Sequence, residues 1–92
     1  MSKYSVEIKE QAQEDLKRLL RSEPNAYSKA LQLISELYET PREGTGHPEH
    51  LKGTSSERWS REITQKHRLV YQILESEIRV YVLSSYGHYD DK

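Results

Sequence analysis

The sequence contains no cysteine, which excludes both a disulfide framework and a zinc site built on thiolates. It also lacks a long apolar run, because no stretch approaches the roughly 20 residues that cross a membrane. No apolar segment of the kind that begins a secreted protein follows Met1. These absences predict a cytoplasmic protein that makes no membrane contact.

The sequence has little excess charge of either sign. Its 14 Lys and Arg nearly balance 15 Asp and Glu, and a formal net charge of −1 argues against a simple nucleic-acid binder with a broad basic surface. The distribution is less even. Residues 47–71 contain five Lys or Arg and three Glu, so this segment carries 5 − 3 = +2. A local basic surface can form there, although composition alone does not establish one.

Apolar residues are also scarce, since 34% of the 92 residues are hydrophobic and 32% are charged. A chain of this length forms one domain, residues 1–92, and buries only about 60% of the surface that its unfolded form exposes. A partner that binds only the folded state adds stability to such a lean core. We therefore expect a homodimer or a cognate binding protein.

Hydrophobic spacing predicts a strand followed by two helices. Tyr4, Val6 and Ile8 alternate with polar residues, which is typical of a half-buried strand. Apolar residues then recur at three- and four-residue spacings from Glu10, with an interruption at residues 22–25 where a proline restarts the helical pattern. The second helix ends before Pro41, because the residue before a proline is driven out of helical geometry.

The second half predicts β structure after a loop over residues 41–53 that is rich in Gly, Pro and His. Residues 59–63 and 69–74 read as two strands around a turn, and residues 78–83 as a last strand. The order β-α-α-β-β-β predicts an α+β fold with the helix pair on one sheet face. The other face is then free for function.

Cleavage of RNA without a metal needs a base for the 2′-hydroxyl proton, an acid for the departing 5′-oxygen and a cation for the phosphate charge. Glu49 in the loop is a candidate base, Arg68 a candidate cation and His88 a candidate acid. Loops and strand ends on a rigid scaffold are common locations for such groups.

Each candidate also has an ordinary structural interpretation. Glu49 beside His50 fits a solvated ion pair, Arg68 fits a charged hairpin and residues 88–89 fit a terminal tail. His47 and His50 together with Glu49 also have a spacing that would suit a metal ion. The residue types alone therefore leave the function open.

Three blocks in the right order resemble the YoeB toxins of type II toxin–antitoxin systems, within the RelE/ParE superfamily. They are Thr40-Pro41-x-Glu43-Gly44-x-Gly46-x-Pro48-Glu49-x-Leu51-Lys52, Trp59-Ser60-Arg61-x-Ile63-Thr64-x-x-His67-Arg68-Leu69-Val70-Tyr71 and Gly87-His88-Tyr89. The resemblance implies a RelE-like fold, with a helix pair packed on one face of a twisted antiparallel sheet.

The resemblance also implies an activity. It points to a ribosome-dependent mRNA endoribonuclease that cuts at the A-site codon by 2′-hydroxyl attack, with no metal or other cofactor. By this resemblance Glu49 is the general base, His88 the general acid, and Arg68 the stabiliser of the transition state. Tyr89 helps to position the substrate or the acid.

Lys52 and Arg61 match family positions that contact RNA phosphates, whereas Glu62 stands where a basic residue is usual. The implied partners are a YefM/Phd-type antitoxin, mRNA on the 70S ribosome and a second copy of the chain. Operator DNA is contacted through the antitoxin. With a net charge of −1, we expect shallower salt dependence of ribosome binding than in a basic relative.

Two other functions remain open within the same superfamily. One is a ParE-like toxin that poisons gyrase without cutting RNA. The other is a decayed toxin that only binds its antitoxin and co-represses its operon. The presence of the Glu, Arg and His-Tyr blocks together favours the nuclease.

Overall fold

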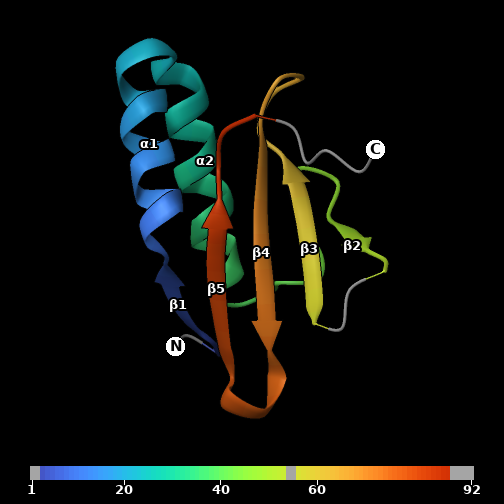
Figure 1. Cartoon of the computed structure of the whole chain (residues 1–92). Helices are drawn as coiled ribbons and strands as arrows, with labels where there is room; N and C mark the ends of the chain where they lie inside the picture. The colour runs from blue at the N-terminus through green and yellow to red at the C-terminus, as the bar shows by residue number, and fades with distance from the viewer. Residues whose placement is uncertain (1–2, 54–55, 88–92) are drawn as a thin grey trace.

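The computed structural model describes residues 3–53 and 56–87, which form a five-stranded sheet with two helices against one face (Figure 1). The elements in chain order are β1 (Ser5–Ile8), α1 (Glu10–Ser22), α2 (Pro24–Leu37), β2 (Glu49–Leu51), β3 (Glu57–Glu62), β4 (Arg68–Leu74), the 3₁₀ turn η1 (Glu75–Glu77) and β5 (Arg79–Ser84). In space the strands follow the order β1-β5-β4-β3-β2. The predicted α+β class and the helix pair on one face are confirmed. In the described residues, no helix has the length and apolar content needed to cross a membrane.

The helix pair forms as the sequence pattern indicates. In α1 the inward side carries Ala12, Leu16 and Leu19, all buried. Pro24 is the first residue of α2, where a backbone N–H would have no helical acceptor and its loss costs nothing. Leu20 belongs to the apolar pattern that begins after Glu10 and is predicted to be buried with it, but half of its surface is exposed, so that part of the prediction is wrong.

The sheet is mixed, not antiparallel as expected, because β1 runs parallel to β5. Nearly the whole chain separates these two strands, so no hairpin forces them into opposite directions. The other three pairings are antiparallel.

The predicted order β-α-α-β-β-β lacks one strand that the structure contains. Residues 49–51 of the predicted loop pair with β3 as the short edge strand β2. Three residues are too few for an alternating pattern to be recognised in a sequence.

The core lies between the helix pair and one face of the sheet. Its members are Tyr4, Ala12, Leu16, Leu19, Ala26, Ala30, Leu33, Ile34, Leu37, Ile63, Leu69, Tyr71, Ile73, Val80 and Val82. Because side chains alternate between the two faces of a strand, these core positions determine which residues of β3 and β4 project from the opposite face.

Candidate active site

The strand register brings Glu49 and Arg68 to the sheet face opposite the helices. Glu49 on β2 lies across from Ser60 on β3, and Ser60 lies across from Val70 on β4. Arg68 is two residues before Val70 on the same strand and therefore shares its face. Glu49 and Arg68 are thus separated by two inter-strand spacings of about 4.8 Å across the sheet and by two residues, roughly 7 Å, along the strands. Long side chains at this separation can reach the two sides of one phosphodiester.

Both side chains are available for a ligand. Glu49 is exposed and Arg68 is partly exposed. Across from Arg68 stands Glu62, its partner in the β3–β4 register. Within residues 3–53 and 56–87, no side-chain hydrogen bond or ion pair engages Glu49 or Arg68.

The chain after β5 returns to the beginning of β4. The backbone N–H of Arg68 donates to the carbonyl oxygen of Gly87 at 2.8 Å, and the N–H of Gly87 donates to Nδ1 of His67 at 2.9 Å. Gly87 directly precedes His88 in the sequence. The predicted acid His88 and the predicted positioning residue Tyr89 lie outside the described residues. Their roles stay predictions, but the residue before them is bound beside Arg68.

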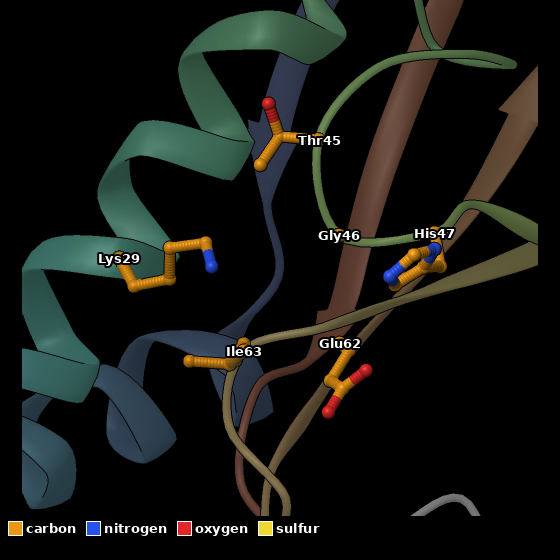
Figure 2. Close-up of a pocket in the computed structure, with 6 residues that line it drawn as sticks. All are labelled: Lys29, Thr45, Gly46, His47, Glu62 and Ile63. Carbon is orange, nitrogen blue, oxygen red and sulfur yellow. The ribbon is translucent and has the colours of Figure 1, made fainter.

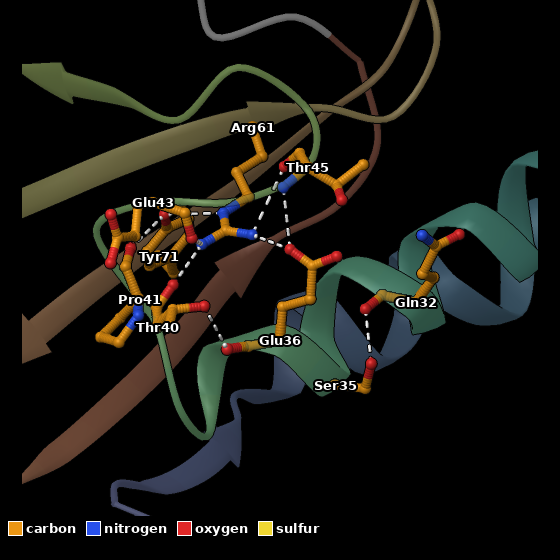
Figure 3. A network of polar contacts seen from close by, with 9 residues as sticks. All are labelled: Gln32, Ser35, Glu36, Thr40, Pro41, Glu43, Thr45, Arg61 and Tyr71. Atoms are coloured by element: carbon orange, nitrogen blue, oxygen red, sulfur yellow. Dashed lines mark hydrogen bonds and ion pairs between the residues drawn. The ribbon is translucent and has the colours of Figure 1, made fainter.

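Arg61 does not lie on this face. Its side chain is fully buried, and Figure 3 shows it surrounded by polar partners. Nε donates to the Tyr71 hydroxyl at 3.0 Å, and Nη1 donates to Glu36 Oε1 at 2.7 Å. Nη2 donates to the carbonyl oxygens of Thr40 at 2.6 Å and Glu43 at 2.9 Å. The expectation that Arg61 contacts RNA phosphates is therefore corrected, because its donors are used inside the protein.

The surroundings of Arg61 shift the pKa values of two neighbouring groups, Glu36 and Tyr71. Burial opposes ionisation of Glu36, but hydrogen bonds from Thr45 and Arg61 outweigh it and lower the pKa of the carboxyl below its ordinary value. Burial raises the pKa of the Tyr71 hydroxyl, which donates to the carbonyl oxygen of Pro41 at 2.7 Å. These bonds fix the loop between α2 and β2, and thereby the point at which β2 begins.

Lys52 follows β2 directly and is exposed. It lies three residues after Glu49, at the same edge of the sheet. The structure leaves it accessible to an RNA phosphate, and its role stays a prediction.

An open pocket of about 340 Å³ lies beside the sheet face that carries Glu49 and Arg68 (Figure 2). It is lined by Lys29, Thr45, Gly46, His47, Glu62 and Ile63. His47 has a φ of 53°, an uncommon backbone conformation for a residue with a side chain. The lining includes neither Glu49 nor Arg68, so the candidate site is the open sheet face and the pocket is its neighbour.

The metal-site interpretation of His47, Glu49 and His50 is not supported. The ring of His50 stacks on Trp59, with centroids 5.1 Å apart, while Glu49 projects from the opposite face of the strand. Over the described part of the chain, no three His, Asp or Glu side chains gather closely enough to hold a metal ion.

Sequence reasoning missed the part played by His67. In the sequence it stands among charged residues in the predicted turn between residues 63 and 69, where an exposed ring is expected, but only 3% of its surface is exposed. Its Nε2 lies 2.7 Å from Glu23 Oε2, at the junction of the two helices. A histidine between Lys66 and Arg68 carries no spacing signal that would distinguish a buried ring from an exposed one.

Residues 8–89 match a family described as YoeB-like toxin of bacterial type II toxin–antitoxin system. The chain is similar to Toxin YoeB of Mycobacterium bovis, with 35% identity over 85 residues that cover 92% of this chain and 98% of that toxin. It is 45% identical to Toxin YoeB of Escherichia coli K12 over 49 residues, which cover 53% of this chain and 58% of the E. coli toxin.

Solved structures give the same likeness over most of the chain. The YoeB/ParE toxin from Agrobacterium tumefaciens superposes with a TM-score of 0.83 and 33% identity, covering 92% of this chain and 99% of that one. The YoeB dimer from Staphylococcus aureus has a TM-score of 0.80 at 28% identity, covering 96% and 100%. A YoeB–YefM complex from the same organism has a TM-score of 0.76 at 29% identity, covering 94% and 98%.

Proposed function

Because the chain belongs to the YoeB-like toxins of bacterial type II toxin–antitoxin systems, we propose that it is a ribosome-dependent endoribonuclease that cuts mRNA at the A-site codon. One observation carries the proposal. The register puts Glu49 and Arg68 on one open sheet face, and Gly87 binds the backbone of Arg68 immediately before His88. The proposed base and cation therefore share one region of the surface, and the residue before the proposed acid is bound in that region.

The proposed reaction needs no metal or other cofactor. Glu49 takes the proton of the 2′-hydroxyl, whose oxygen attacks the adjacent phosphorus while the bond from phosphorus to the 5′-oxygen breaks. His88 gives its proton to that 5′-oxygen, which leaves a 2′,3′-cyclic phosphate and a free 5′-hydroxyl. Arg68 stabilises the charge that builds on the phosphate oxygens, and Tyr89 orients the acid or the substrate. A positioned acid or base contributes about 10²–10⁴-fold in rate.

We propose that RNA binds both on the sheet face that carries Glu49 and Arg68 and at the edge of the sheet beside β2. Lys52 contacts an RNA phosphate beside the reacting one, whereas Arg61 supports the loop from inside. Glu62 faces the same side as Arg68 and reduces the positive potential there. A chain with a net charge of −1 then depends on the ribosome to present the message.

The proposed partners follow from the relatives. One structural neighbour is a YoeB–YefM complex and another is a YoeB dimer. We accordingly expect a YefM-like antitoxin to bind this chain, and a second copy to pair with it. Contacts with operator DNA then come through the antitoxin. The compartment proposed for all of this is the cytoplasm, where ribosomes and message are found.

The test is cleavage of a defined message on purified 70S ribosomes in buffer with enough free Mg²⁺ to keep the ribosomes intact, read by primer extension. Wild-type protein is expected to cut at the A-site codon and to leave the same message intact without ribosomes. Glu49→Gln should slow single-turnover cleavage on the order of 10²-fold, because it removes the base. Glu39→Gln is the matched control, since Glu39 is an exposed carboxylate on the same chain, and should cut at the wild-type rate.

Intact message under these conditions, with growth arrest on expression, would overturn the nuclease proposal. Double-strand DNA breaks in the arrested cells would then indicate the gyrase-poisoning alternative. Normal growth under full induction without antitoxin would indicate a chain whose remaining role is antitoxin binding and operon repression.

A further inference from the structure

His67 is buried at the meeting point of three segments that are distant in the sequence. Its Nε2 is 2.7 Å from Glu23 Oε2, between α1 and α2. Its Nδ1 accepts the backbone N–H of Gly87 at 2.9 Å. Its own backbone is held by the turn, where the N–H of Ile63 donates to the His67 carbonyl oxygen at 2.9 Å. Only 4% of the imidazole side chain is exposed, so water does not compete for these partners.

The two hydrogen bonds allow one neutral tautomer. A backbone N–H can only donate, so Nδ1 must present a lone pair to Gly87. The ring proton is then on Nε2 and is donated to Glu23. The hydrogen bond from His67 in turn lowers the pKa of the Glu23 carboxyl, with Lys66 adding to the effect at a longer distance. A proton on Nδ1 would set two N–H groups against each other and break the contact with Gly87.

The remaining residues of this terminal segment are anchored as well. The N–H of Ser85 donates to the buried carboxylate of Asp15 at 2.9 Å, and its hydroxyl reaches the carbonyl oxygen of Ala12. The Tyr86 ring packs between the His67 ring, 4.4 Å away, and the Arg18 guanidinium, 4.0 Å away. The segment is thus led from the helix side of the fold to the start of β4.

From these contacts we infer that His67 is a positioning residue, which as the neutral Nε2–H tautomer holds Gly87 against the start of β4 and so fixes the point from which the chain continues to His88. The inference rests on the proposed function, in which His88 is the acid. Without the acceptor at Nδ1, Gly87 keeps only its carbonyl contact with the Arg68 backbone. The chain then leaves β4 from a less firmly held residue, and the proposed acid loses that fixed starting point. The charged groups that face the ring are Glu23, Lys66 and, through Tyr86, Arg18.

Two substitutions test the hydrogen bonds of the two ring nitrogens one at a time. His67→Gln extends an amide toward Glu23 and retains that donor, but offers nothing to the Gly87 N–H. His67→Asn retains an acceptor near Nδ1 and gives up the contact with Glu23. Gln65→Asn changes an exposed residue of the same turn and serves as the control.

The first measurement is hydrogen exchange of the Gly87 amide in the full chain by NMR. In His67→Gln the exchange should accelerate about tenfold or more, because local opening no longer breaks a hydrogen bond to the ring. In His67→Asn the protection should return toward wild type. The ring ¹⁵N shifts of wild-type His67 should report a protonated Nε2 and a bare Nδ1, and this measurement needs no variant.

The second measurement is single-turnover cleavage on mRNA-programmed ribosomes, with binding measured separately. A misplaced acid should lower the cleavage rate of His67→Gln on the order of 10²-fold and leave ribosome affinity within about twofold of wild type. His67→Asn should recover most of the rate, and Gln65→Asn should match wild type.

Several outcomes would overturn the inference. They are a Gly87 amide as protected in His67→Gln as in wild type, equal rate losses in His67→Gln and His67→Asn, or a wild-type ring protonated at Nδ1. If His67→Gln does not fold, the ring ¹⁵N shifts and His67→Asn decide the matter. If wild-type protein does not cut at all, the proposed function fails, while Gly87 exchange and the ring shifts still determine whether His67 holds the segment.

Discussion

The guanidinium of Arg61 joins three parts of the chain that no backbone ladder joins. It binds Glu36 near the end of α2, the carbonyl oxygens of Thr40 and Glu43 in the loop, and the hydroxyl of Tyr71 on β4. Five donors in one plane suit this arrangement, whereas a lysine ammonium has three donors on a flexible stem. The charge is buried, so its value to the fold depends on all of these partners being present.

Arg61→Lys should therefore lower stability without a specific loss of RNA binding. The substitution keeps the charge but leaves at least one buried carbonyl oxygen of the loop unpaired. We expect the free energy of unfolding to fall by about 2–3 kcal/mol, measured by urea denaturation. Ribosome affinity of the folded fraction should stay near that of wild type.

Lys52→Ala is the opposite case. Its side chain is exposed, so the free energy of unfolding should change by less than about 0.5 kcal/mol, while ribosome affinity falls. Should Arg61→Lys prove fully stable and weak in ribosome binding, the phosphate-contact role first expected for Arg61 would be restored.

The loop between α2 and β2 acts as an element in its own right, because its geometry determines where Glu49 begins the edge strand. Gly44 is its tightest point. Its φ is 130°, and a Cβ added there would lie 2.5 Å from Glu36 Oε1 and 3.1 Å from Arg61 Nη1. Backbone conformation and space both therefore require glycine at this position.

Gly44→Ala should destabilise the fold and reduce cleavage together. The strained backbone costs roughly 1–3 kcal/mol, and displacement of Glu36 from Arg61 adds to it. Gly53→Ala is the matched control, because Gly53 also has a positive φ but a Cβ there would meet no atom of the described residues within 4 Å. The free energy of unfolding of Gly53→Ala should fall by only about 1–2 kcal/mol, because the left-handed backbone is its sole cost. Thermal unfolding measures both, and equal losses would show that the contact with Glu36 carries no cost.

At the scale of elements, much of the fold could be predicted from periodicity. Both helices, the hairpin of β3 and β4, and β5 fell within one or two residues of the expected positions. Periodicity could not predict the short strand β2 or the parallel pairing of β1 with β5, because both depend on contacts between distant segments. The same limit applies to the site. Glu49 and Arg68 are recognisable from residue type and motif, whereas the burial of Arg61 and His67 follows from tertiary packing that no local spacing records.

At the scale of the whole molecule, the near-neutral charge bears on how the protein meets a polyanion. We expect charges on the free sheet face to affect binding of the message more than charges on the helix side. Glu62 is the cross-strand neighbour of Arg68 on the free face, while Glu14 is exposed on α1 on the helix side. Each carries one negative charge, so their removal changes the net charge identically, from −1 to 0. Glu14 also lies 3.6 Å from Lys17 in an exposed ion pair of little strength, so position is the main difference between them.

Glu62→Gln should tighten binding to mRNA-programmed ribosomes by about twofold to fivefold at low salt, equivalent to no more than about 1 kcal/mol at this partly exposed site. The gain should shrink as salt rises, because the Debye length falls from about 10 Å at 0.1 M to about 3 Å at 1 M. Glu14→Gln should change affinity much less, since α1 lies on the other side of the sheet. Affinity measured across a salt series for both variants provides the comparison. Equal gains would mean that net charge alone controls the encounter, and no gain in Glu62→Gln would mean that the face around Arg68 does not meet the message.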